Sequence, residues 1–346
     1  MTDNGDRRPS LQVRVPVITR NGLEEDANSS PPTTHGFSPE SDRTLVTPVT
    51  SPISWTTDAP LPPWHEEERE EDVRWCRIKD VGFEGEIVGK GSFCKVVKSN
   101  TVYAVKTTLH ETAVDMLFHE AKILSSIEPG ARGIERFHGM ITNGKKYGIV
   151  MEYYPFTLST YLASLNPVTT TTWNNFVGDK LWLSWSIQLC QGLKSLQDHE
   201  IVHCDIKSAN VFLDVHLRAY LGDFSSAHTT AELAILDDSQ SMLAYSINFS
   251  APELLSKRHA IPTFASDIYS LGLVLFHAAT GNEPYSLATK NVSQKLIWAQ
   301  RGYALTYCSD EDISRSKSVL PYLERFITHR QQIDEIVDTL MQASKD

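Results

Sequence analysis

The chain has 346 residues and a formal net charge of −11, and 41% of its residues are hydrophobic. At roughly 150 residues per domain, this length allows about two globular units, and the apolar content can bury a core, which excludes a chain disordered throughout. The negative charge argues against a main role on nucleic acid or an anionic membrane, because both require a basic face.

The five cysteines include no Cys-x-x-Cys pair, so we predict neither a disulfide framework nor a zinc site and favour a reducing compartment. The sequence does not open with the charged-then-apolar pattern of a secretion signal. Its longest apolar stretch, 271–279, is less than half of the roughly 20 residues that span a bilayer. We therefore expect a soluble intracellular protein, cytoplasmic or nuclear, of unknown oligomeric state, with no nucleic-acid or membrane partner.

Residues 1–72 hold ten of the 17 prolines, many Ser and Thr residues, and a terminal acidic run over 66–72. No apolar period lasts long enough to offset the entropy of ordering, so we expect a disordered tail. Four hydroxyls precede proline and are candidates for proline-directed phosphorylation, although such pairs also arise by chance in this composition. They are Ser30, Ser38, Thr47 and Ser51.

A folded domain is expected over 73–346. Short β-rich runs predict strands, apolar positions at helical spacing predict helices, and the helices dominate beyond Tyr154. The predicted strands are 83–88, 95–98, 102–107, 135–141 and 147–152. The predicted helices are 111–127, one ending near Gln197 with an apolar stripe of Leu183, Ile187, Cys190 and Leu193, and those over 266–280 and 333–341, with a polar loop at 166–180. This predicts a small β-rich lobe at about 80–152 and a larger helical lobe at about 155–343.

A glycine turn, Gly89-Lys90-Gly91-Ser92-Phe93-Cys94-Lys95-Val96, lies between the first two predicted strands. Gly89 and Gly91 would let backbone N–H groups approach phosphate oxygens without interference from a Cβ. Val96 would cover one face of a base. Taken alone, however, a Gly-x-Gly is more often a plain hairpin turn.

Lys106 ends the apolar run Tyr103-Ala104-Val105, where an ammonium is costly to bury without a partner. Glu120, on the helix that follows, is the natural candidate, and the pair would aim the ammonium at phosphate oxygens. The alternative is that Lys106 reaches solvent and Glu120 is an ordinary surface acid.

The strongest signal is His203-Cys204-Asp205-Ile206-Lys207-Ser208-Ala209-Asn210, which fits His-x-Asp-x-Lys-x-x-Asn. The carboxylate can accept a hydroxyl proton, the lysine can steady a moving phosphoryl group, and the amide oxygen can bind Mg²⁺. Asp223, in Asp-Phe-Ser, lies 18 residues after Asp205. A carboxylate there could bridge Mg²⁺ to the phosphates of ATP.

Together these motifs resemble the eukaryotic protein kinase family, in the family's order, over about residues 80–343. The resemblance implies an α+β, bilobal protein-kinase fold: a small antiparallel sheet with one helix, followed by a larger, mostly helical lobe. It also implies roles for the residues that match the motifs. Lys106 and Glu120 form an ion pair, Asp205 is the catalytic base with Lys207 beside it, and Asn210 and Asp223 hold Mg²⁺.

The same resemblance implies an ATP site in the small lobe and at the junction with the large lobe. Met151 would be the gatekeeper, with the Glu152 C=O and the Tyr154 N–H facing adenine. The implied ATP-binding residues are Gly89, Gly91, Val96, Ala104, Lys106, Met151, Glu152, Tyr154 and Phe212. Phe212 would form the floor of the base pocket.

The resemblance further implies phosphoryl transfer from ATP to Ser/Thr hydroxyls of a protein substrate, because Lys207 follows the Ser/Thr pattern and Ser246 would contact the base. Ala251-Pro252-Glu253 would close the activation segment. Asp267 would accept hydrogen bonds from the catalytic-loop backbone. Two alternatives stay open: a pseudokinase scaffold that binds nucleotide without efficient transfer, and a small-molecule phosphotransferase.

The sequence departs from the family pattern at several positions, including Cys94 in place of a third glycine. Cys204 replaces the arginine that would bind an activation-loop phosphate, so we expect activity not to depend strictly on that phosphate. Ser225 replaces a glycine, and because serine adopts positive φ at a cost, we expect rearrangement of the Asp-Phe pair to be disfavoured. Either Arg325 or Arg330 could pair with Glu253.

Overall fold

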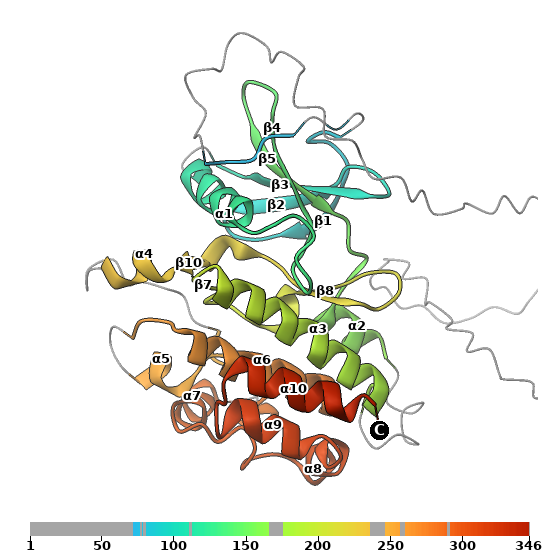
Figure 1. Cartoon of the computed structure of the whole chain (residues 1–346), viewed down its shortest axis with the longest axis vertical. Helices are drawn as coiled ribbons and strands as arrows, with labels where there is room; N and C mark the ends of the chain where they lie inside the picture. Colours follow the sequence, from blue (N-terminus) through green and yellow to red (C-terminus); the bar gives the residue numbers. More distant parts are fainter. Residues whose placement is uncertain are drawn as a thin grey trace, which may run out of the picture. The chain divides into compact units, whose positions relative to one another are not determined.

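Figure 1 shows the computed structural model, which describes residues 72–76, 78, 81–110, 113–165, 176–235, 246–256, 260–288 and 291–345. All of them belong to the second of two units in the chain, Trp64–Asp346. The predicted tail with its Ser-Pro and Thr-Pro sites (Ser30, Ser38, Thr47 and Ser51) lies outside the described residues, apart from Asp72. Most of the predicted polar loop at 166–180 also lies outside them.

The small lobe is a five-stranded antiparallel sheet, in the order β1-β2-β3-β5-β4, with one helix packed against it (Figure 1). Its elements are β1 (Glu86–Lys90), β2 (Cys94–Lys98), β3 (Tyr103–Thr108), α1 (Val114–Ser126), β4 (Phe137–Thr142) and β5 (Tyr147–Glu152). All five predicted strands and the helix form. The first strand begins later than predicted, at Glu86, directly after Gly85 (φ 153°), which passes so close to the Lys98 backbone that a side chain could not fit.

An N-terminal segment, residues 72–76, packs against α1 from outside the sheet. Val73 is 5% exposed, and Trp75 forms a parallel bridge with Met140 of β4. The Trp75 ring lies 6.1 Å from the ring of Phe118 on α1. The Arg74 guanidinium donates hydrogen bonds to two carbonyls at the C-terminal end of α1. The sequence analysis began the small lobe near residue 80 and did not predict these contacts.

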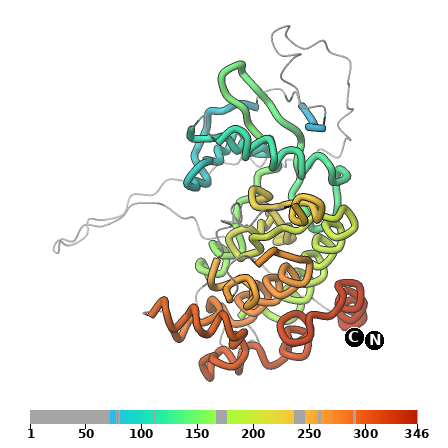
Figure 2. The backbone as a smooth tube through the Cα atoms, turned by 90° about the vertical axis from the view of Figure 1, so that its left-hand side faces the viewer, coloured from blue at the N-terminus to red at the C-terminus, as the bar shows by residue number. Residues whose placement is uncertain are grey.

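The large lobe is mostly helical, and the coils of its helices make up most of the yellow-to-red part of the tube in Figure 2. Its strands are β6 (Phe156–Thr157), β7 (Ile201–Val202), β8 (Val211–Leu213), β9 (Ala219–Leu221) and β10 (His228–Thr229). Its helices are α2 (Leu158–Ser164), α3 (Asp179–Asp198), α4 (Thr230–Ile235), α5 (Pro252–Ser256), α6 (Phe264–Thr280), α7 (Val292–Gln300), α8 (Asp310–Ser316), α9 (Leu320–Ile327) and α10 (Ile333–Ala343).

Helix α6 is the centre of the large lobe and is buried from Ser266 to Thr280, as predicted. Thr263 caps its N-terminus with a capping box, and Gly281, in the left-handed conformation, ends it. Helices α3, α8 and α9 all pack against it. Within the described residues, no helix is both long and apolar enough to cross a membrane.

The buried face of α3 is rotated from the predicted stripe. Cys190 and Leu193 are buried as expected, but Leu183 and Ile187 are only half-buried. Two tryptophans take their place inside, at positions 182 and 185. Each can be buried because its indole N–H has a carbonyl partner, Leu275 for the first and Leu217 for the second.

Candidate active site

Lys106 lies on β3 between its neighbours in β2 and β5, and its side chain is 9% exposed. Its Nζ is 2.7 Å from the Glu120 carboxylate on α1 and 2.7 Å from Asp223 Oδ1. Burial alone would lower the pKa of Lys106, but the two carboxylates outweigh it and hold that pKa above its usual value. The ammonium therefore stays charged. The alternative in which Lys106 reaches solvent is wrong.

Asp223 follows β9 and sits in a left-handed turn, with φ 58°. Burial would raise its pKa, but the charge of Lys106 and the hydrogen bonds from Lys106 and Ser225 lower it to about 2. The next residue, Phe224, is fully buried, and its ring packs 4.9 Å from that of His203. The carboxylate is thus ionised, and the buried Phe224 ring holds the backbone next to it.

Ser225 does not adopt a positive φ, and whether rearrangement of the Asp-Phe pair is disfavoured stays a prediction. It lies in a short 3₁₀ turn, Phe224–Ser226, and the left-handed φ falls on Asp223 instead. The Ser225 hydroxyl donates a hydrogen bond to Asp223 Oδ1 at 2.9 Å. The serine therefore carries no positive-φ strain here and adds a donor to the Asp223 carboxylate.

The catalytic-loop residues converge on Asp205. Lys207 Nζ lies 2.6 Å from Asp205 Oδ2, and Ser246 Oγ donates to Asp205 Oδ1 at 3.2 Å. The Asn210 amide donates to the Asp205 carbonyl at 2.9 Å and to Asp205 Oδ2 at 3.1 Å. The Gly222 N–H donates to the Asn210 carbonyl at 2.9 Å, which joins this loop to the segment that carries Asp223.

Asp267 of α6 accepts hydrogen bonds from the backbone of the catalytic loop, as predicted. It accepts the N–H of His203 at 2.7 Å and that of Cys204 at 3.2 Å. Burial raises the pKa of Asp267 to about 7, although the two N–H bonds act in the opposite direction. Cys204 itself has φ 65°, and its thiol donates to the Val202 carbonyl. It is half-buried, and burial raises the pKa of its thiol.

The glycine turn connects β1 and β2, as predicted. Gly89 lies at a register shift opposite Val96, and the Gly91 N–H donates to the Cys94 carbonyl at 2.8 Å. Cys94 begins β2 opposite Thr108. Burial raises the pKa of the Cys94 thiol, with smaller contributions from Lys106, which lowers it, and from the acids beyond. The thiol therefore stays protonated near this turn.

The predicted base-pocket residues come from both lobes. Ala104 and Met151 are paired neighbours in β3 and β5, and both are buried. The Tyr154 ring stacks on Phe212 with centroids 5.5 Å apart, and its hydroxyl oxygen accepts the Arg136 N–H. The Phe212 ring lies over Gly222, where any side chain would collide with it. The sequence analysis did not predict this aromatic stack.

Arg330 is the partner of Glu253. Its guanidinium makes two hydrogen bonds to the carboxylate, at 2.6 and 3.0 Å, and lies over the Tyr269 ring at 4.7 Å. Arg325 instead donates to Gln331. The choice left open between the two arginines is thereby resolved by geometry that sequence spacing could not supply.

Glu135 is a further site residue that the sequence analysis missed, because it was assigned only to a strand. It is 3% exposed and accepts the Asp223 N–H at 2.9 Å. Burial, followed by the charge of Glu120, raises the pKa of Glu135 to about 8. The observed strand β4 begins only at Phe137, because the Glu135 backbone pairs with β9 instead.

A sequence model of the family described as "Protein kinase domain" matches residues 83–343, which is 261 of the 346 residues. The chain therefore belongs to the protein kinase family. The predicted family and the predicted bilobal α+β fold are confirmed.

Several curated proteins are similar to this chain. It is 25% identical over 251 residues to mitogen-activated protein kinase kinase kinase ANP1 of Arabidopsis thaliana, covering 68% of this chain and 34% of the relative. It is 30% identical over 217 residues to mitogen-activated protein kinase kinase kinase 1b of Physcomitrium patens, covering 60% and 26%. It is 27% identical over 236 residues to mitogen-activated protein kinase kinase kinase dlk-1 of Caenorhabditis elegans, covering 66% and 22%. The chain thus spans about a third or less of the length of each relative.

Proposed function

We propose that this protein transfers the γ-phosphoryl group of ATP to serine and threonine hydroxyls of protein substrates. The observation that carries the proposal is the bridge made by Lys106, whose ammonium lies 2.7 Å from both Glu120 and Asp223. Because acids from two different elements hold this buried ammonium, its position and direction in the site are fixed. The hydrogen bond from Gly222 to Asn210 brings this group against the Asp205 loop.

ATP would bind with its phosphates at the glycine turn and at Lys106. The Lys106 ammonium is the charged donor for the phosphate oxygens, and the absence of a Cβ at Gly89 and Gly91 would let the phosphates approach the turn closely. The Gly91 N–H donates to the Cys94 carbonyl in this structure, so it would have to leave that acceptor to bind a phosphate. Ala104 and Val96 would cover one face of the base, and Phe212 the other. The role of Glu120 is to position Lys106.

The donor set at Asn210 and Asp223 fits a magnesium ion. Asn210 uses its amide nitrogen toward Asp205, so its amide oxygen is left as an acceptor, and Asp223 adds an ionised carboxylate. The described residues contain no cluster of three His, Cys, Asp or Glu side chains arranged to hold a metal, so phosphate oxygens and water would complete the coordination. When bound, Mg²⁺ would neutralise charge on the phosphates during transfer.

Asp205 would orient the acceptor hydroxyl and take its proton late in the transfer. Ser246 and Lys207 hold one carboxylate oxygen each, which sets the direction of the carboxylate. Lys207 is also placed to stabilise negative charge on the phosphoryl group during its transfer. The preference for Ser/Thr over Tyr rests on Lys207 and on the Ser246 hydroxyl.

The test is radiolabel transfer from γ-labelled ATP to a mixture of protein acceptors, with wild type beside Asp205→Asn. We expect the Asn variant to lose about 10²- to 10⁴-fold in kcat, the usual contribution of a general base, while binding nucleotide as before. Asp338→Asn, an equal change of charge on the exposed side of α10, is the matched control and should match wild type.

Nucleotide binding by wild type without any transfer would contradict the proposal and identify a nucleotide-binding scaffold. Transfer to a small molecule but to no protein would identify a small-molecule phosphotransferase. Loss of nucleotide binding in Asp205→Asn would contradict the role given to Asp205.

A further inference from the structure

Glu135 is a buried acid for which the proposed chemistry has no use. It lies just before β4, is 3% exposed, and reaches the junction of the two lobes. One carboxyl oxygen, Oε1, accepts the Asp223 N–H at 2.9 Å, whereas Oε2 is buried without a hydrogen-bond partner among the described residues. Burying a polar oxygen without a hydrogen-bond partner costs free energy, so the presence of this acid here calls for an explanation.

The Glu135 backbone is hydrogen-bonded to the end of β9, the same segment that its side chain contacts. Its N–H donates to the Leu221 carbonyl at 2.8 Å, and the Leu221 N–H donates to the Gly133 carbonyl at 2.8 Å. Ile134 and Leu221 form a parallel bridge. Residues 133–135 therefore run beside the end of β9 as a short extra strand, and the Glu135 side chain reaches two residues further, to Asp223.

Asp223 has an uncommon backbone conformation, with φ 58°. Aspartate is one of the few residues with a Cβ that adopt this left-handed region, so the conformation is accessible but has to be selected over the ordinary ones. Its carboxylate must nonetheless point at Lys106. The Glu135 acceptor stabilises the one backbone arrangement in which it does so.

We propose that Glu135 is a positioning residue for Asp223: by accepting the Asp223 N–H, it fixes the left-handed turn from which the Asp223 carboxylate reaches Lys106 and the predicted magnesium site. This rests on the proposed function for the role of Asp223, but not for the hydrogen bond itself. Glu135 touches neither the phosphates nor the acceptor hydroxyl in this scheme, so it acts through Asp223 alone.

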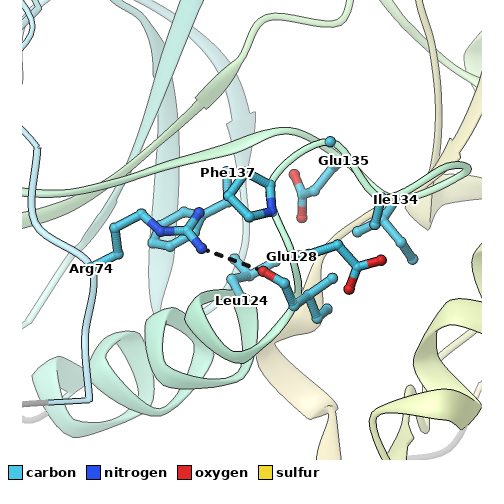
Figure 3. A pocket seen from close by; sticks show the side chains of 10 residues that line it. Arg74, Leu124, Glu128, Ile134, Glu135 and Phe137 are labelled. Atoms are coloured by element: carbon cyan, nitrogen blue, oxygen red, sulfur yellow. Dashed lines mark hydrogen bonds between the residues drawn. The ribbon is translucent and has the colours of Figure 1, made fainter. Parts of the chain in front are cut away.

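A ligand-binding role for Glu135 fits the structure less well. Glu135 lines a cavity of about 20 Å³ together with Arg74, Glu128 and Phe137, and Figure 3 shows these side chains entering it from different segments. This volume holds about one water molecule and no nucleotide or peptide. The directed contact that remains is the hydrogen bond to Asp223.

The test compares three substitutions in the full-length protein. Glu135→Gln keeps an oxygen acceptor of the same reach, Glu135→Leu fills the space without an acceptor, and Glu135→Asp keeps the carboxyl but withdraws it by one methylene. Leu340→Ala removes packing from the buried side of α10, far from Asp223 and Lys106, and controls for general destabilisation. If Glu135→Leu fails to fold, Glu135→Asp carries the comparison.

The first readout is hydrogen exchange of the peptide 221–226 without nucleotide. We expect Glu135→Gln to match wild type, and Glu135→Leu and Glu135→Asp to exchange about ten-fold faster, the equivalent of one lost hydrogen bond. Leu340→Ala should leave this peptide unchanged relative to its neighbours. Unchanged exchange in both Glu135→Leu and Glu135→Asp, or exchange in Glu135→Gln as fast as in Glu135→Leu, would overturn the proposal whether or not the protein is a kinase.

The second readout is the Mg²⁺ concentration that half-saturates the thermal shift produced by ATP. It should rise several-fold in Glu135→Leu and Glu135→Asp and stay near the wild-type value in Glu135→Gln and Leu340→Ala. Equal Mg²⁺ dependence in all four variants would overturn the link from Glu135 to the magnesium site. Because this readout needs no phosphoryl transfer, its result is independent of the transfer assay.

Discussion

Two helices support the candidate active site, and they are built very differently. Helix α6 has 15 of its 17 residues buried and is capped at both ends, and through Asp267 it holds the catalytic loop. Helix α1 has five of its 13 residues buried and no side-chain cap at its N-terminus, and through Glu120 it holds Lys106. Half of the site is thus fixed by the core of a lobe, and the other half by a helix on its edge.

The position of α1 depends on groups that approach it from outside the sheet. Trp75 packs on Phe118, and Arg74 donates to carbonyls at the helix end. On the side of the large lobe, His119 Nε2 lies 2.8 Å from the Ala227 carbonyl oxygen. A change in these contacts therefore acts directly on the Lys106–Glu120 pair, whereas the catalytic loop takes its main support from α6.

The largest expected effect follows from removing the hydrogen bonds by which α6 holds the catalytic loop. Asp267→Ala leaves the N–H groups of His203 and Cys204 without their acceptor in a buried place, so we expect a loss of about 3 kcal/mol in the free energy of unfolding. Denaturant titration measures it. Asp267→Asn keeps one acceptor oxygen and should lose about half as much. A change in Asp267→Ala within about 0.5 kcal/mol, as for an ordinary surface residue, would show that α6 does not anchor the loop.

The pH dependence of stability tests the contact between α6 and the catalytic loop at a second residue, His277. His277 on α6 contacts Ser208 Oγ at 2.9 Å, and burial lowers its pKa to about 4. Between pH 6.5 and 4 the unfolded chain binds a proton that the folded protein does not, so stability falls as the pH falls through this window. The loss should reach about 2–3 kcal/mol from pH 7 to pH 4.5.

The matched variant for this titration is His277→Gln, because the difference between its pH dependence and that of wild type isolates His277. His138, whose pKa burial also lowers to about 4, then contributes equally to both proteins. Parallel stability curves for wild type and His277→Gln would count against the assignment.

On the small-lobe side, Trp75→Ala removes the ring that packs on α1. Because Trp75 is only partly buried, we expect the free energy of unfolding to fall by about 2 kcal/mol, which is less than for a fully buried tryptophan. We also expect a several-fold drop in the rate of phosphoryl transfer. Trp75→Phe should recover most of both. Met116→Ala, at an exposed position of the same helix, is the control and should change neither. Equal effects of the Trp75→Ala and Met116→Ala substitutions would mean that residues 72–76 do not support α1.

The smallest effect is expected from removing phosphate. Cys204 offers no cation to an activation-loop phosphate, and the segment after Phe224 is held instead by pairing of β10 with β7. Treatment with a phosphatase should therefore change the transfer rate by less than about two-fold. A collapse in rate, measured beside a mock-treated sample, would show that another cation has taken over the role of that arginine.

The parts of the site that sequence could predict are those in which spacing along one loop determines geometry. Asp205, Lys207 and Asn210 lie within six positions, and their contacts are largely local. The hydrogen bond from Asp223 to Glu135 joins residues 88 positions apart, and no local pattern marks it. The left-handed conformation falls on Asp223 and not on Ser225, and no local sequence pattern distinguishes the two. The roles of the predicted ATP-binding and magnesium-binding residues stay predictions.

Hydrogen exchange with and without Mg²⁺ and a non-hydrolysable ATP analogue tests most directly whether one half of the site is preformed and the other conditional. We predict that amides of residues 203–210 are strongly protected before nucleotide is added and gain little from it, while those of α1, residues 114–126, start less protected and gain clearly. Equal protection of the two regions without nucleotide, or a larger gain in the catalytic loop than in α1, would contradict the account.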